Sequence, residues 1–235
     1  MRGKLYGVGV GPGDPELITL KAKRVLEEVG CLAVPKTSSE KESLALSIVR
    51  GISGTEKELV ELLFPMSFDE KLLEKSWGRA VEEVMGRLEA GKDVAFITLG
   101  DPTVYSTYMY IHRALKRQGY DTEIVPGITS FCASSAKVGI SLAENRETLA
   151  VVPSAYDCEN LDEILDRFDN VVLMKISRKF AELKKKLIDK GLGGKAVLVS
   201  RCGLDGEMIE FDLEAVDEKV LSYFSTMIIK KNGVE

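Results

Sequence analysis

The stretch that decides the fold lies near the start of the chain and reads KLYGVGVGPGDPELIT over residues 4–19. Its first half, about Lys4 to Val10, is apolar and rich in valine, which predicts a buried strand. Gly11-Pro12-Gly13-Asp14-Pro15 then predicts a turn, because glycine and proline are the strongest local breakers of regular structure. Thr19 is placed to cap a following helix whose apolar positions share one face. Strand, glycine-rich turn and helix in this order form the first unit of an α/β fold.

The same alternation continues to the end of the chain, which predicts an α/β protein with much parallel sheet. Further strands are expected at Cys31 to Val34, Glu58 to Phe64, Asp93 to Leu99, Thr122 to Val125, Leu149 to Val152, Val171 to Ile176, Ala196 to Ser200, Met208 to Phe211 and Phe224 to Lys230. Helices are expected at Leu44 to Val49, Glu70 to Ala90, Tyr105 to Gln118, Leu161 to Arg167 and Phe180 to Lys190. The pattern restarts after Pro126, so we expect two α/β domains, residues 1–126 and 127–235, bridged by an apolar helix before Gly139.

Composition narrows the class of function. The 235 residues are 45% hydrophobic, and 32 Lys plus Arg stand against 37 Asp plus Glu, for a net charge of −5. An acidic balance with both signs interspersed argues against nucleic acid as the main partner. No apolar run approaches the ~20 residues that a membrane-spanning helix needs. The start of the chain lacks the pattern of a secretory signal, so a cytoplasmic protein is expected.

Histidine and cysteine usage bears on metal binding. His112 is the sole histidine, and the four cysteines, Cys31, Cys132, Cys158 and Cys202, are far apart in the sequence. Metal sites built by the protein need clusters of such residues at short spacing. We therefore expect no protein-bound metal, and reduced, mostly buried thiols.

Three loops follow predicted strands and carry the strongest functional signal. They are Gly9 to Pro15, Gly100-Asp101-Pro102 and Pro126 to Ser130. Ligands of open α/β sheets bind at the carboxyl ends of the strands, and glycine lets a ligand approach the main chain. Each loop taken alone is better explained as a tight turn than as a binding site.

Two common nucleotide motifs are absent. In the dinucleotide pattern G-x-G-x-x-G, the third glycine would fall on Pro12 counting from Gly7, and on Asp14 counting from Gly9. No acidic residue ends the second predicted strand, and no Gly-Lys-Ser or Gly-Lys-Thr follows a glycine-rich turn. A nicotinamide enzyme and a P-loop phosphotransferase are both disfavoured.

Tyr6 to Thr19, Leu99 to Pro102 and Ile124 to Ser130 resemble, in order and spacing, the three signature segments of the tetrapyrrole methylase family. The resemblance covers essentially the whole chain. It implies two α/β domains with a cleft between them, S-adenosylmethionine (SAM) as methyl donor at the bottom of the cleft, and a tetrapyrrole macrocycle above it. It also implies a homodimer with twofold symmetry.

Within the family the chain is most similar to the branch that methylates C20 of precorrin-2 or cobalt-factor II in cobalamin biosynthesis. The supporting segments are Val34-Pro35-Lys36, Phe64 to Asp69 and Gly100 to Tyr108. Another ring position (C2/C7, C11 or C17) is the alternative within the family. RNA ribose methylases and diphthine synthases carry other residues at Gly11 to Pro15, and a noncatalytic nucleotide-binding α/β module is the alternative of a different class. Any cobalt would arrive inside the substrate.

The resemblance also implies site residues. Contacts to SAM fall to Pro12, Leu99, Gly100, Asp101, Val104, Thr129, Ser130, Met174, Ser225 and Thr226, and contacts to the acceptor to Gly11, Asp14, Lys36 and Tyr105. Many relatives carry Ser-Pro-Ala in the region of Ser225 and Thr226, so either of the two is a candidate there. Core packing explains Met174 equally well, backbone binding explains Asp14 better than proton transfer, and an ordinary exposed lysine explains Lys36 equally well. No general base is identified.

Overall fold

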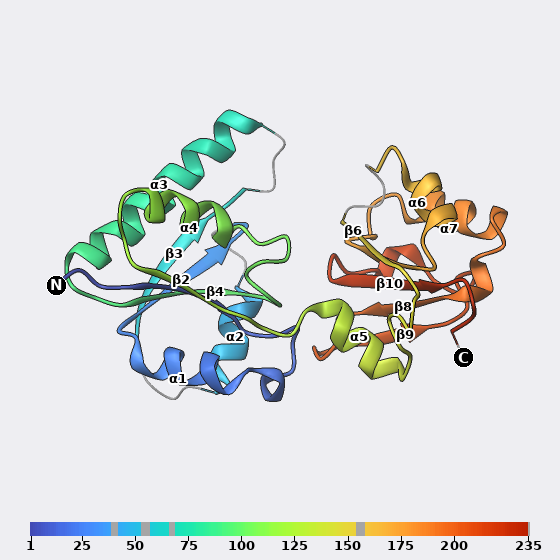
Figure 1. The fold of residues 1–235 in the computed structure, drawn as a ribbon, viewed down its shortest axis with the longest axis horizontal. Helices are drawn as coiled ribbons and strands as arrows, with labels where there is room; N and C mark the ends of the chain where they lie inside the picture. Colours follow the sequence, from blue (N-terminus) through green and yellow to red (C-terminus); the bar gives the residue numbers. More distant parts are fainter. Residues whose placement is uncertain (39–41, 53–56, 66–68, 154–157, 235) are drawn as a thin grey trace. The chain divides into compact units, whose positions relative to one another are not determined.

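The computed structural model describes residues 1–38, 42–52, 57–65, 69–153 and 158–234 (Figure 1). The chain divides into two compact units, Met1–Thr129 and Ser130–Glu235. Their division falls in the loop and helix start that follow Pro126, close to the boundary expected from the sequence. Each unit has its own sheet and core.

The first unit is a parallel five-stranded sheet in the order β3-β2-β4-β1-β5. Its strands are β1 (Leu5–Gly9), β2 (Cys31–Lys36), β3 (Glu58–Leu63), β4 (Val94–Thr98) and β5 (Thr122–Val125). Every residue of β4 is buried, as a central strand covered on both faces requires. The order makes β4, β1 and β5 neighbours, so the three loops that follow them leave the same edge of the sheet.

Helices cover both faces of this sheet, as Figure 1 shows. They are α1 (Leu20–Glu28), α2 (Leu44–Arg50), α3 (Glu70–Glu89) and α4 (Tyr108–Arg117), with a short 3-10 helix at Pro15–Leu17. Helices α1 and α2 pack in one apolar cluster on one face, and α3 and α4 in a second cluster on the other. Thr19 caps α1 as predicted, because its Oγ1 accepts a hydrogen bond from the Ala22 amide at 3.1 Å.

The second unit has a mixed sheet in the order β6-β7-β10-β8-β9. Its strands are β6 (Leu149–Pro153), β7 (Asn170–Met174), β8 (Ala196–Ser200), β9 (Met208–Glu210) and β10 (Ser225–Lys230). Its helices are α5 (Ser130–Val138), α6 (Leu161–Arg167) and α7 (Phe180–Asp189), with 3-10 turns at Gly193–Lys195 and Glu218–Val220. Helices α6 and α7 pack on one face of the sheet, and side chains of α5 on the other.

The α/β class is confirmed, but the expected parallel sheet is realised fully only in the first unit. In the second unit β6 and β7 are parallel, while β10 runs antiparallel to both β7 and β8. The cause is connectivity: β8 leads into β9 and β10 through turns, without the crossover helix that a parallel neighbour requires.

The four cysteines are free thiols. Cys31 is buried, whereas Cys132 is exposed and Cys158 and Cys202 are half-buried. The expectation of mostly buried thiols is therefore wrong, because three of these cysteines lie on helices and loops near the surface. Within the described ranges, no helix combines the length and apolar character needed to cross a membrane.

Candidate active site

The three predicted loops meet at one edge of the first sheet. The Gly100 amide donates a hydrogen bond to the Gly11 carbonyl at 2.7 Å, and the Gly11 amide faces the Gly100 carbonyl at 3.4 Å. The Gly127 amide donates to the Asp101 carboxylate at 2.9 Å. The loops after β1, β4 and β5 are therefore joined by hydrogen bonds, as the sequence analysis requires.

Glycine is needed where these loops cross. A Cβ on Gly9 would lie 2.6 Å from both the Gly100 carbonyl oxygen and the Gly127 amide nitrogen, and a Cβ on Gly127 would lie 2.2 Å from the same oxygen. These are backbone atoms that cannot rotate away. Gly11 and Gly100 have positive φ angles of 80° and 73°. The close approach that the sequence analysis assigned to a ligand is thus, at Gly9 and Gly127, an approach between loops.

The Asp101 side chain fastens the loops to one another. It is 7% exposed, and its carboxylate accepts hydrogen bonds from the Thr103 amide at 2.7 Å, from the Thr103 hydroxyl and from the Gly127 amide. The Val104 amide donates to the Asp101 carbonyl at 3.2 Å and closes a turn. Leu99 is half-buried beside this turn. Hydrogen bonds within and between the loops therefore hold the main chain around Asp101 in place.

The first loop is held in the same way. Pro12 is buried, and Asp14 caps the 3-10 helix Pro15–Leu17 by accepting a hydrogen bond from the Glu16 amide at 2.8 Å. Binding to backbone amides, the explanation preferred from the sequence, accounts for this carboxylate.

Thr129 presents an unsatisfied group close to the joined loops. Its Oγ1 is buried and has no hydrogen-bond partner among the described residues. Buried hydroxyls normally find a partner, so an orphan next to a loop cluster indicates a place for a ligand atom or a water molecule. Ser130 follows as the first residue of α5 and belongs to the second unit.

Lys36 and Tyr105 have contrasting surroundings. The Lys36 side chain is only 12% exposed, and its Nζ lies 3.1 and 3.2 Å from the two carboxylate oxygens of Glu61 on β3. The alternative of an ordinary exposed lysine is therefore wrong, because the neighbouring strand supplies a counter-ion. Tyr105 is 49% exposed with a positive φ of 50°, a strained conformation for a residue with a bulky side chain.

The remaining predicted residues, Met174, Ser225 and Thr226, lie where β7 ends and β10 begins in the second sheet. Met174 ends β7 directly opposite Thr226 of β10, and it packs against the apolar cluster that α5 contacts. Ser225 is 2% exposed; its hydroxyl donates to the Ser222 carbonyl at 2.6 Å and lies 2.9 Å from the Ser200 hydroxyl. Thr226 is 4% exposed. The three side chains thus lie around the beginning of β10.

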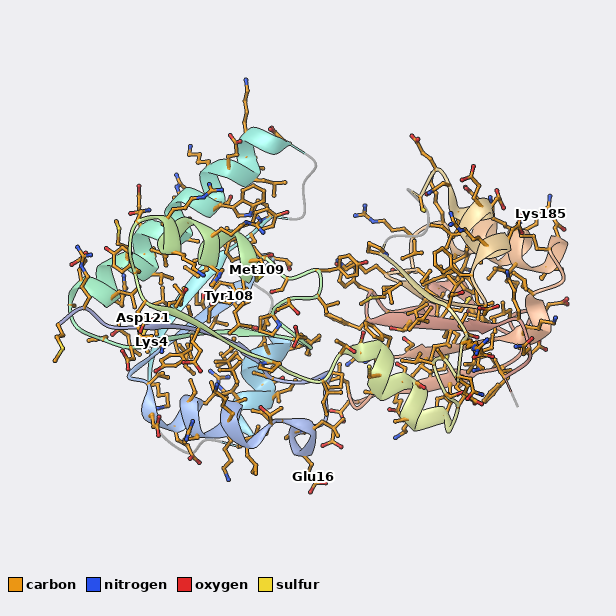
Figure 2. The ribbon with its side chains drawn as sticks, viewed as in Figure 1. Lys4, Glu16, Tyr108, Met109, Asp121 and Lys185 are labelled. Carbon is orange, nitrogen blue, oxygen red and sulfur yellow. The ribbon has the colours of Figure 1, made fainter. Side chains whose placement is uncertain are left out.

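A hydroxyl pair below the second loop escaped the sequence analysis. Thr98 Oγ1 lies 3.0 Å from Ser106 Oγ, and Ser106 Oγ accepts from the Tyr108 amide at 3.2 Å. The Tyr108 ring is buried against the sheet (Figure 2), at 2.2 Å from where a Cβ on Gly7 would be, and burial raises the pKa of its phenol. The polar residue that ends the otherwise apolar segment Val94–Thr98 is the signal by which the sequence could have indicated this contact.

Two further predictions concern the segment Phe64 to Asp69 and metal binding. In the segment Phe64 to Asp69, used to place the chain in the C20 branch, residues 66–68 are outside the described residues. No group of three or more His, Cys, Asp or Glu side chains is placed to hold a metal ion in the described part of the chain.

Two α/β units, one with three glycine-containing loops joined at the carboxyl edge of a parallel sheet, place the chain in the class of α/β proteins whose ligands bind at that edge. The family model for Tetrapyrrole (Corrin/Porphyrin) Methylases matches residues 4–217, so the chain belongs to that family.

Relatives over the full length sharpen this assignment. The chain is 39% identical to the cobalt-precorrin-2 C(20)-methyltransferase of Salmonella typhimurium, covering 98% of both chains. It is 27% identical to the precorrin-2 C(20)-methyltransferase of a Sinorhizobium species, covering 97% of this chain and 95% of the relative.

Solved structures agree on the fold. The uroporphyrin-III-C-methyltransferase of Thermus thermophilus superposes with a TM-score of 0.71 at 26% identity, covering 98% of this chain and 93% of the other. Another structure of the uroporphyrin-III C-methyltransferase from Thermus thermophilus, complexed with S-adenyl homocysteine, gives a TM-score of 0.69 at 23% identity, covering 97% and 98%.

Proposed function

We propose that this chain transfers a methyl group from SAM to C20 of precorrin-2 or its cobalt-containing form in cobalamin biosynthesis. The observation that carries the proposal is the full-length similarity to two C(20)-methyltransferases. The joined loops of the first unit support it, because they form the kind of preorganised surface on which a donor can be aligned with an acceptor.

The contacts to SAM that we propose are those that the family resemblance implies. Pro12, Leu99, Gly100, Asp101, Val104 and Thr129 would contribute from the first unit, and Ser130, Met174, Ser225 and Thr226 from the second. The orphan Thr129 hydroxyl fits the polar amino-acid end of SAM, whose ammonium and carboxylate can both pair with a hydroxyl. SAM supplies an electrophilic methyl group on sulfur. The residues around it hold donor and acceptor in line and exclude water, which is where most of the rate enhancement would arise.

Gly11, Asp14, Lys36 and Tyr105 are our candidates for contacts with the acceptor. Tyr105 is best supported, since its side chain is half exposed on a strained loop residue. Lys36 is already paired with Glu61, so it would reach a substrate carboxylate only by sharing or exchanging its partner. During the reaction a bond forms between C20 and the methyl carbon as the bond to sulfur breaks, and C20 then loses its proton. We assign no residue to that proton.

The decisive experiment incubates the protein with carbon-13-labelled SAM and each acceptor, and locates the new methyl group by NMR. We expect the label at C20. Label at C2, C7, C11 or C17 would overturn the ring position while leaving the family intact, and no transfer to either acceptor would overturn the function. We expect faster transfer to the cobalt form, because the cobalt-precorrin-2 relative is 39% identical against 27% for the other.

Assembly and location are further parts of the proposal. The family resemblance supports a twofold homodimer in the cytoplasm. Light scattering during gel filtration tests the oligomeric state, and a monomer at micromolar concentration would contradict it.

A further inference from the structure

Two cations of the second unit have strained backbones at the same edge of the sheet. Lys175 directly follows β7 and Arg201 directly follows β8, with φ angles of 56° and 55°. A left-handed conformation is uncommon for residues other than glycine and costs free energy, so it persists where surrounding structure enforces it. Such strain is concentrated at functional sites.

Hydrogen bonds to the start of β10 enforce the conformation. The Lys175 amide donates to the Ser225 carbonyl at 3.2 Å, and the Arg201 amide donates to the Phe224 carbonyl at 2.9 Å. Because β10 lies between β7 and β8, the two cationic residues stand on either side of it. Twice the strand spacing puts their backbones about 10 Å apart. This spacing allows each cation to pair with a separate anionic group of one ligand.

Neither cation has its charge balanced locally. No carboxylate of the described residues lies within ion-pair distance of Lys175 or Arg201. Arg201 Nε donates to the Asp205 carbonyl at 2.5 Å, which orients the guanidinium without neutralising it. Both side chains are only half exposed. Half-buried cations without a counter-ion favour an anionic ligand.

An exposed aromatic pair lies next to them. Tyr223 and Phe224, 42% and 37% exposed, pack edge to face with ring centroids 5.4 Å apart, and Lys175 Nζ is 5.7 Å from the Tyr223 ring centroid. The turn that carries them is fixed, because the Ser225 hydroxyl donates to the Ser222 carbonyl and the Phe224 amide to the Ser222 hydroxyl. A rigid aromatic surface between two cations suits a flat apolar frame that carries several carboxylates.

We propose that Lys175 and Arg201 each bind a carboxylate of the tetrapyrrole acceptor, while Tyr223 and Phe224 contact its ring. This inference rests on the proposed function for the identity of the ligand. It assigns acceptor contacts to residues of the second unit.

The test separates acceptor binding from donor binding and from turnover. Lys175→Met, Arg201→Met and the double variant are compared with Lys185→Met, which removes an exposed charge from α7 in the same unit (Figure 2). Uroporphyrin III, a stable polycarboxylate macrocycle, is titrated by fluorescence, and SAM by calorimetry. We expect each single variant to weaken porphyrin binding about tenfold, at unchanged SAM affinity. Lys185→Met should match the native protein, and Lys175→Arg should restore most of the binding.

Two results would overturn the inference: porphyrin affinity of the double variant within twofold of native, or loss of SAM affinity equal to the loss of porphyrin affinity. The latter would assign the two cations to the donor site. Folding of each variant is checked by circular dichroism and by its urea unfolding midpoint. If no acceptor is methylated at C20 but the variants still lose porphyrin binding, the proposed ring position fails while the carboxylate contacts stand.

Discussion

At the scale of single residues, glycines determine how closely the three loops of the candidate site can pack. Gly9 and Gly127 allow the three loops to approach so closely that a Cβ at either position would clash with backbone atoms, and Gly100 supplies a positive φ angle. Asp101 then completes the junction with hydrogen bonds to two loops. Contacts within the protein therefore hold the proposed ligand-binding loops in position before any ligand binds.

The junction predicts a sharp effect of Gly9→Ala. Its Cβ would lie 2.6 Å from two backbone atoms, so the loops must separate. We expect the free energy of unfolding in urea to fall by about 2–3 kcal/mol, as for overpacking of a tight site, and SAM affinity to fall with it. Gly30→Ala is the matched control, since nothing lies within 4 Å of its Cβ. Equal stability of the two variants would contradict a tight junction.

At the scale of secondary structure, capping and hydrophobic periodicity account for most helices, and contacts between elements fix their ends. Helix α3 shows both, with Asp69 capping its first turn through the amides of Lys71 and Leu72. Two glycines, Gly78 and Gly86, lie inside this helix, and a Cβ added at either position would have no neighbouring atom within 4 Å.

Gly78→Ala should therefore stabilise the protein. Alanine in the interior of a helix is favoured over glycine by about 0.5–1 kcal/mol, and the space at Gly78 is open. The urea midpoint should rise by the corresponding amount, with activity unchanged. A lower midpoint would mean that Gly78 is covered in solution.

An ion-pair cluster joins β5 to α1 and to the start of β1. Glu123 lies 2.6 Å from Lys21 Nζ and 2.9 Å from Lys4 Nζ, and these hydrogen bonds, that of Lys21 first, lower the pKa of Glu123 to about 2. A carboxylate with a depressed folded-state pKa stabilises the fold fully above its unfolded pKa of about 4.3. The contribution is lost as the pH falls from there towards 2.

Glu123→Gln should consequently cost about 1 kcal/mol of unfolding free energy at pH 7, a value reduced for solvent screening because the side chain is 31% exposed. The deficit should shrink as the pH falls through the range from 4 to 2. Urea titrations at several pH values measure it, with Glu74→Gln on α3 as a control for loss of a surface charge. A deficit independent of pH would show that the cluster does not titrate as described.

At the scale of the whole molecule, two different sheets give two independent cores. The first unit encloses its sheet between two helical layers, and the second places an antiparallel strand at the centre of its sheet. A donor that binds only the folded protein should raise its stability.

Saturating SAM should raise the thermal midpoint. At a donor concentration of about 100 times Kd, linkage gives about 2.7 kcal/mol, or roughly 5–10 °C for a chain of this size. Scanning fluorimetry measures the shift, and S-adenosylhomocysteine should act in the same direction, while ATP serves as a control with a shared adenosine. No shift with either sulfur ligand would contradict the proposed donor site.

The sequence by itself determined the α/β class, the position of nearly every strand and helix, the Thr19 cap and the three loops, because these follow from local periodicity, capping and turn chemistry. Only the tertiary structure decided that Glu61 neutralises Lys36 and that β10 lies antiparallel between β7 and β8. It also decided that Gly9 and Gly127 make room for the backbone of neighbouring loops and not for a ligand. Each of these depends on a partner distant in the chain, and no local pattern encodes which partner the fold brings near. The same holds for Lys175 and Arg201, which are 26 positions apart in the sequence. The fold brings them near each other because only β10 lies between the strands that they follow.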